Sequence, residues 1–112
     1  TCKAVPPEVN EFEISGLSTA PSRLVKVPRV AESPVSFECR CTEILQMKNL
    51  QGELLQTWMV FGEVIGVHID EKLLNNGIYD TANAQHVLRG GGPADYFSIG
   101  PEQLFKLHRP SN

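Results

Sequence analysis

Two neighbouring segments of the chain constrain its fold most strongly, because together they form the pattern of a long β-hairpin. In residues 35–47, apolar side chains alternate with polar ones, which predicts a strand with one buried and one solvated face. In residues 54–69, apolar residues fall on both faces, which predicts a barrel stave or an oligomer interface. Asn49 and Gly52 supply turn-compatible backbone between the two. We expect this hairpin to carry the core, with these side chains buried: Phe37, Cys39, Val60 and Ile65.

The remaining segments predict short elements around this hairpin. Pro6-Pro7 followed by EVNEFEI favours a short helix that ends at Gly16. Residues 17–34 are rich in proline, and we expect extended backbone with a short strand at residues 23–27. Asn76-Gly77 predicts a turn, and Asp80 or Thr81 can cap a helix through TANAQHVLR that ends at Gly90. The predicted class is therefore mainly β with short peripheral helices.

Length and charge exclude several functional classes. The 112 residues suffice for one domain, and the longest apolar runs are too short for a membrane-spanning helix. A net charge of -3 without a cluster of Lys or Arg argues against nucleic acid as a partner. There is no export signal, and three cysteines cannot all pair, so we expect a soluble protein in the reducing cytoplasm.

Few residues indicate chemistry. The two thiols of Cys39-Arg40-Cys41 are interpreted as small core residues, and no metal site is expected. His68 is either a structural histidine of its strand or a ligand contact that donates a hydrogen bond to a cofactor. Arg89 to Gly92 is either a helix stop with a mobile loop or a place where bare backbone approaches a flat ligand. In the second case Arg89 supplies charge, and Tyr96 supplies a ring and a hydroxyl group.

Four motifs in a fixed order carry a family resemblance. They are NEFEISGL, PSRLVKVPRVAESPVSFECRC, GEVIGVHID and LRGGGPADYFSIG. This order resembles the C-terminal half of the flavin reductase-like family, NAD(P)H:flavin oxidoreductases with an FMN-binding split β-barrel. The ordered pair RVAESPVSFEC and GEVIGVHID is the most specific part, and the resemblance covers nearly the whole chain.

The resemblance implies that residues 1–112 are the C-terminal portion of a single flavin reductase-like domain, part of an FMN-binding split β-barrel. It implies a homodimer that binds FMN, with FAD as the alternative flavin, and that takes hydride from NADH or NADPH. Electrons would pass to free flavin, a monooxygenase or another acceptor protein. The positions that match the family's motifs are expected to contact the cofactor: His68, Arg89, Gly90, Gly91 and Tyr96.

Two alternative interpretations of the chain remain beside a flavin-dependent enzyme. The chain has too few predicted strands to close a six-stranded barrel, so we expect a fragment, a cleaved product or a chain whose N-terminal part is not included. Such a fragment could lack its flavin-binding half and be inactive. Alternatively, the domain is a non-catalytic FMN-binding or structural module. Bleaching of a bound yellow chromophore by NADH would distinguish an enzyme from such a module.

Overall fold

A computed structural model describes residues 10–111 of the chain, so Cys2 and the predicted helix start at Pro6-Pro7 lie outside the described residues. The chain divides into two compact units, residues 1–69 and residues 70–112. Among the described residues, no helix has the length and apolar character that crossing a membrane requires. Helices are few and short, and most regular structure is strand, so the prediction of a mainly β chain is confirmed.

The first unit begins with a short helix, α1 (Glu11–Ser15). Its N-cap is Asn10, whose side chain accepts a hydrogen bond from the backbone N–H of Phe12 at 2.9 Å. Gly16 ends the helix with φ of 72°, a left-handed conformation that glycine adopts without steric cost. The predicted end of this helix is therefore confirmed.

The prediction of a strand at residues 23–27 is wrong. Two short strands, β1 (Thr19–Ala20) and β2 (Arg29–Val30), pair with each other, and residues 23–27 form the bent loop between them. Pro21 and Pro28 flank this loop, and proline interrupts the pairing of a strand. The amides of the loop do not join a ladder; three of them donate to one carboxylate, as described below.

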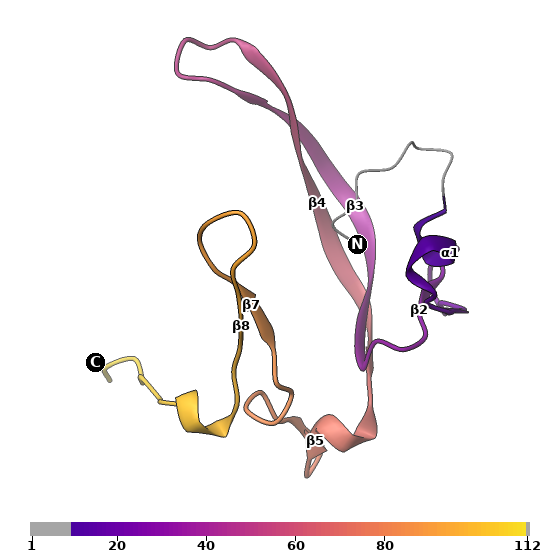
Figure 1. Ribbon diagram of the computed structural model, residues 1–112, viewed down its shortest axis with the longest axis vertical. Coiled ribbons are helices and arrows are strands. Elements are labelled where there is room, and N and C mark those ends of the chain that lie inside the picture. Colours follow the sequence, from indigo (N-terminus) through magenta and orange to yellow (C-terminus); the bar gives the residue numbers. More distant parts are fainter. Residues whose placement is uncertain (1–9, 112) are drawn as a thin grey trace. The chain divides into compact units, whose positions relative to one another are not determined.

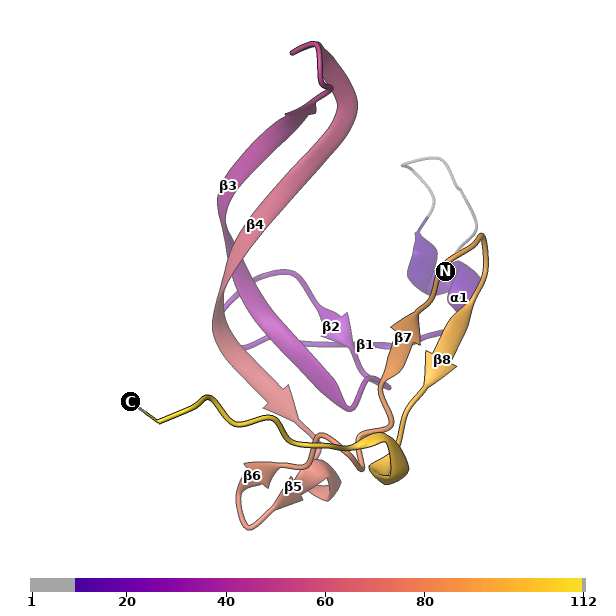
Figure 2. The same cartoon turned by 90° about the vertical axis from the view of Figure 1, so that its left-hand side faces the viewer.

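The predicted hairpin is confirmed almost to the residue. Strand β3 (Val35–Lys48) pairs antiparallel with β4 (Leu54–Ile69), and Figures 1 and 2 both show the pair as a long twisted ribbon. Asn49 closes the connection, because its side-chain oxygen accepts from the amides of Gln51 at 3.0 Å and Glu53 at 2.9 Å. Gly52, with φ of 81°, completes the turn.

Three irregularities shift the register of this hairpin, and they change which side chains share a face. One falls between Glu38 and Cys39, where Ile65 is the extra residue on β4. Because of this bulge, Gly66 and His68 lie on the face of Ser36 and Glu38, opposite to that of Gly62 and Trp58. Strict alternation along β4 would instead place His68 on the same face as Gly62 and Trp58.

Among the residues that the structure describes, the predicted buried core is not present. Phe37 is 62% exposed and Val60 is 64% exposed, while Cys39 is exposed and Ile65 is half-buried. Among residues 10–111 no hydrophobic side chain is buried. A two-stranded ribbon has no second layer of its own, so the apolar residues on its two faces stay accessible.

The second unit consists of small hairpins and single turns. A 3₁₀ turn, η1 (Glu71–Leu73), precedes the hairpin of β5 (Leu74–Asn75) and β6 (Ile78–Tyr79). The expected turn at Asn76-Gly77 connects these strands, with positive φ at both residues. Strands β7 (Val87–Arg89) and β8 (Tyr96–Ser98) form the next hairpin, and the 3₁₀ turn η2 (Pro101–Gln103) follows.

The predicted helix through TANAQHVLR is therefore wrong. Asp80 does accept a hydrogen bond from the backbone N–H of Asn83 at 3.2 Å, as a cap would, but the chain makes only one turn. Gln85, with φ of 53°, ends this turn. Residues 87–89 then pair with 96–98, so cross-strand hydrogen bonds replace helical ones.

Candidate functional site

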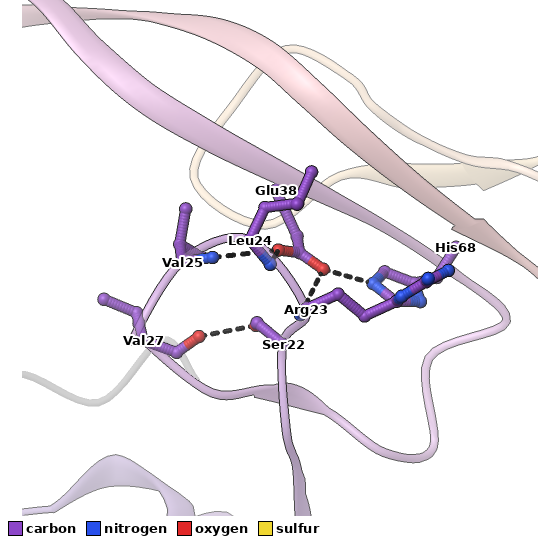
Figure 3. Close-up of polar contacts among 7 residues, drawn as sticks. All are labelled: Ser22, Arg23, Leu24, Val25, Val27, Glu38 and His68. Atoms are coloured by element: carbon purple, nitrogen blue, oxygen red, sulfur yellow. Dashed lines mark hydrogen bonds and ion pairs between the residues drawn. The ribbon is translucent and has the colours of Figure 1, made fainter.

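The most completely organised polar cluster of the first unit surrounds Glu38 on β3 (Figure 3). Glu38 is 3% exposed and is the only buried residue among those that the structure describes. Its carboxylate accepts from three consecutive backbone amides, those of Arg23 at 2.9 Å, Leu24 at 2.6 Å and Val25 at 3.1 Å. It also lies 2.5 Å from Nε2 of His68. One carboxylate thus joins the 22–27 loop to both strands of the hairpin.

These contacts hold Glu38 in its ionised form. They lower the pKa of Glu38 from 4.5 to about 2, with the amide of Arg23 as the largest cause and the hydrogen bond with His68 next. The amides of Leu24 and Val25 act in the same direction, and loss of hydration works against them. A buried carboxylate is tolerated here because four donors replace the water that it loses.

The register of the hairpin explains why these side chains meet. Ser36 lies opposite His68, and Glu38 lies opposite Gly66. Glu38 and His68 are therefore diagonal neighbours on one face, a spacing that long side chains can bridge. Gly66 makes room for the loop, because a Cβ at this position would lie 3.2 Å from Cδ1 of Leu24.

Two further hydrogen bonds stabilise the loop, one within it and one to the hairpin. The hydroxyl of Ser22 donates to the carbonyl of Val27 at 2.6 Å and so closes the loop on itself. A guanidinium nitrogen of Arg40, on β3, donates to the carbonyl of Leu24 at 3.4 Å. The loop is therefore held to β3 through three of its amides and one of its carbonyls.

A small pocket opens beside this network. It has a volume of about 240 Å³, and these residues line it: Arg23, Leu24, Glu38, Gly66, Val67 and His68. The side chain of His68 is 23% exposed, so part of the ring is accessible. The guanidinium of Arg23 has no hydrogen bond or ion pair with any residue that the structure describes, and Figure 3 shows it extending toward His68. The pocket therefore offers one imidazole and one cation to a ligand.

The other predicted site residues lie together in the β7–β8 hairpin of the second unit. Arg89 pairs with Tyr96 across the hairpin, and its guanidinium lies 4.9 Å from the centroid of the Tyr96 ring. The same guanidinium donates to the carbonyls of Gly90 at 3.0 Å, Gly92 at 2.8 Å and Asp95 at 2.8 Å. Arg89 therefore organises the tip of this hairpin.

The two glycines of the predicted site differ in their surroundings. A Cβ on Gly90 would lie 2.7 Å from Cε2 of Phe97 and 3.2 Å from the carbonyl oxygen of Asp95. A Cβ on Gly91 would meet no atom within 4 Å. Gly90 is thus closely packed against Phe97 and Asp95, whereas Gly91 presents bare backbone.

Sequence reasoning missed Glu38 and the amides of residues 23–25. Alternation along β3 had assigned Glu38 to the solvated face, and that assignment is wrong. Two signals could have revealed it. The loop between Pro21 and Pro28 carries amides that need an acceptor. On the returning strand, Gly66 lies opposite Glu38, and His68 lies opposite Ser36.

The chain resembles several solved structures in fold. It is 23% identical to nitrilotriacetate monooxygenase component B from Bacillus cereus, with a TM-score of 0.78 over 92% of this chain and 49% of that one. It is 25% identical to a 2-nitrobenzoate 2-nitroreductase from Pseudomonas fluorescens, with a TM-score of 0.70 over 94% of this chain and 50% of that one. A split-barrel protein from Shewanella frigidimarina matches 99% of this chain and 51% of its own, with 20% identity and a TM-score of 0.66. The fold is therefore that of part of a split β-barrel.

The chain is also similar in sequence to curated proteins. An uncharacterised protein of Halalkalibacterium halodurans is 32% identical over 107 residues, which are 96% of this chain and 49% of that protein. An uncharacterised protein of Aquifex aeolicus is 33% identical over 78 residues, which are 70% of this chain and 36% of that protein. The chain thus spans at most about half the length of these relatives.

A family model identifies what these proteins share with the chain. The model described as the flavin reductase like domain matches residues 1–88, which include the Glu38 network and most of β7. The match covers more than half of the chain and agrees with the fold of the structural relatives. The chain therefore belongs to the flavin reductase-like domain family.

Proposed function

We propose that this chain is part of an FMN-dependent oxidoreductase that transfers electrons from NADH or NADPH to a flavin or another acceptor. The observation that carries the proposal is the family match over residues 1–88, which contains the pocket that His68 lines. The name of the Pseudomonas relative, a nitroreductase, also supports a redox reaction.

The chemistry of the described residues agrees with a cofactor-dependent reaction. His68 is hydrogen-bonded to a buried carboxylate and has no hydrogen bond to a serine or a cysteine among residues 10–111. The chain therefore supplies binding and electrostatics, and a bound flavin would supply the electron-accepting ring. His68 would hold the ligand at the pocket edge, and Glu38 would keep its ring in place.

The size of the pocket sets a limit on what it can hold. Sites that enclose a whole ligand of drug size measure roughly 300–1,000 Å³, whereas this pocket measures about 240 Å³. It fits the edge of a ring or one substituent of a flavin or nicotinamide. We therefore propose His68 as one contact among several, with others contributed elsewhere in the intact protein.

As a separate proposal, the tip of the β7–β8 hairpin contacts the flavin through Arg89, Gly90, Gly91 and Tyr96. The bare backbone at Gly91 supports this, because a flat ring could approach it without meeting a side chain. The stacked pair of Arg89 and Tyr96 adds a cation and an aromatic surface. The proposal is tested by the Gly91 variant described in the Discussion.

The assembly and setting are proposals too. We infer that residues 1–112 are the C-terminal portion of one flavin reductase-like domain, since the family match runs past residue 69 into the second unit. The uncovered apolar faces of β3 and β4 support a homodimer. The free thiols of Cys39 and Cys41 support a reducing cytoplasmic setting. A monooxygenase as electron acceptor rests on fold-level analogy to the Bacillus relative.

Absorption spectroscopy of the purified protein tests the proposal. FMN, FAD and riboflavin are added separately, and we expect FMN to bind most tightly. NADH and NADPH are then added without oxygen, and loss of the flavin's blue absorption is the expected result. Binding without bleaching would indicate the non-catalytic module instead, and absence of binding by all three flavins would refute both.

A further inference from the structure

The hydrogen bonds around Glu38 determine which nitrogen of His68 carries its proton. An ionised carboxylate can only accept hydrogen bonds. One oxygen of Glu38 takes the amides of Leu24 and Val25, and the other takes the amide of Arg23 and Nε2 of His68. Nε2 must therefore be a donor, because a bare nitrogen facing the carboxylate would repel it.

This arrangement leaves Nδ1 of His68 for a ligand. In the neutral ring, a proton on Nε2 makes Nδ1 an acceptor. Nδ1 has no hydrogen bond to any residue between 10 and 111, and the partly exposed ring lines the pocket. Arg23, whose guanidinium has no partner among residues 10–111, lines the same pocket, so the pocket offers both an acceptor and a cation.

We propose that Glu38 is a positioning residue, which fixes the Nε2–H form of His68 so that Nδ1 accepts a hydrogen bond from an N–H group of the bound cofactor. The imide N–H of a flavin ring and the carboxamide of a nicotinamide share this chemistry. Glu38 does not touch the ligand, since all four of its acceptor positions are occupied. The identity of the ligand rests on the proposed function, whereas the protonation of His68 does not.

A simpler role for Glu38 makes a different prediction. If Glu38 only clamps residues 23–25 to the hairpin, then His68 is one more donor and its free nitrogen has no consequence for binding. Loss of the Glu38 charge would then weaken the structure equally with or without His68. The two roles are distinguished by the state of the ring and by the coupling between the residues.

Nitrogen-15 NMR of the histidine rings in the purified protein tests the first step directly. The chain has 3 histidines, and the His68 signal is assigned by its loss in His68→Ala. We expect wild-type His68 in the Nε2–H form. We expect Glu38→Gln to give a mixture of the two forms, because an amide can donate to or accept from the ring.

Glu63→Gln serves as the matched control. Glu63 is an exposed carboxylate on β4, so its substitution removes the same charge from the same hairpin. It should leave the His68 signal unchanged. A wild-type ring protonated on Nδ1 alone would overturn the proposal, and this result needs no variant to fold. An unchanged ring in a folded Glu38→Gln protein would overturn it as well.

A double-mutant cycle tests the second step. We expect Glu38→Gln and His68→Ala each to weaken binding of the cofactor about five- to tenfold, the loss expected for one hydrogen bond. Together they should weaken it no more than His68→Ala alone. The cycle is measured with FMN and, separately, with NADH, and the ligand that shows the coupling is the one that His68 contacts.

The outcomes separate this inference from the proposed function. If no flavin or nicotinamide binds, the proposed function fails while the NMR result still decides the state of His68. If FMN or NADH binds and the two substitutions are additive with both ligands, Glu38 is only a clamp and the inference fails.

Discussion

At the scale of single residues, the charge of Glu38 links stability to pH. Its pKa is lowered from 4.5 to about 2 in the folded protein, chiefly by the amide of Arg23 and by His68. A lowered pKa means that the unfolded chain binds the proton more tightly, so Glu38 contributes stability above pH 4.5 that is lost toward pH 2. We expect the free energy of unfolding to fall across this window in wild type.

The contribution of Glu38 is isolated by substitution. In Glu38→Gln the position cannot titrate, so the unfolding free energy should vary less between pH 2 and 4.5 than in wild type. Chemical denaturation at a series of pH values measures this. Glu63→Gln, an exposed carboxylate on the same hairpin, should keep the wild-type dependence. Parallel curves for wild type and Glu38→Gln would contradict the prediction.

Two adjacent glycines separate packing from ligand contact. Gly90→Ala would press a methyl group onto Phe97 and the carbonyl of Asp95, and we expect it to lower the free energy of unfolding by about 1–3 kcal/mol. The methyl group of Gly91→Ala would point into open space, so its free energy of unfolding should stay within about 0.5 kcal/mol of wild type. Thermal unfolding measures both. If the flavin approaches this backbone as proposed, Gly91→Ala should nevertheless weaken flavin binding, and unchanged binding would argue against that contact.

At the scale of elements, Arg89 determines the shape of the β7–β8 tip. Its guanidinium donates to three backbone carbonyls, so Arg89→Ala should lower the free energy of unfolding by about 1 kcal/mol. This loss is separate from any weakening of flavin binding. The amide of Gly90, which donates to Asp95 at 2.7 Å, should exchange with solvent faster. Hydrogen exchange followed by NMR measures this loosening.

Arg89→Lys is the control for charge alone. A lysine retains the positive charge but cannot reproduce the planar set of donors. We expect it to resemble Arg89→Ala in exchange of the Gly90 amide. Wild-type protection in Arg89→Lys would show that charge, and not the three hydrogen bonds, holds the tip.

The elements that could be predicted are those where pattern and turn chemistry agree. For β3 and β4, alternation, continuous hydrophobicity and the turn at Asn49 all indicated one hairpin, and its limits were correct within one residue. For residues 80–90 the capping signals at Asp80 and Gly90 were misleading. A helix of this length is marginal by itself, and the pairing of Val87–Arg89 with Tyr96–Ser98 decided the structure.

The candidate site was only partly predictable for a related reason. His68 was identified by its residue type and its place in the strand. Glu38 was missed because a single bulge at Ile65 and a distant loop determine its surroundings, and neither follows from alternation along β3. Burial of a charge depends on donors far away in sequence, here 13 to 15 residues.

For the assembled protein, the uncovered faces of the hairpin predict self-association. Large apolar residues remain exposed along both strands, including Ile44, Trp58 and Val60. The chain has 1 tryptophan, so Trp58 reports on one of these faces. We expect its fluorescence to shift to the blue with rising protein concentration, and sedimentation to show a dimer. A stable monomer with water-like Trp58 emission would contradict this.

The cost of truncating Phe37 decides whether the hairpin is covered in the assembled protein. Within this chain Phe37 is 62% exposed beside its cross-strand partner Val67. Truncation at such a surface site changes the free energy of unfolding by no more than about 0.5 kcal/mol. If a second copy or further strands cover this face, Phe37→Ala should instead cost about 3–5 kcal/mol, as in a core. We expect the larger value in the associated protein, measured by denaturation above the concentration at which it dimerises. Leu50→Ala is the control, because Leu50 is 96% exposed at the hairpin turn and should change little. Equal, small costs for both substitutions would show that the face of Phe37 stays in water.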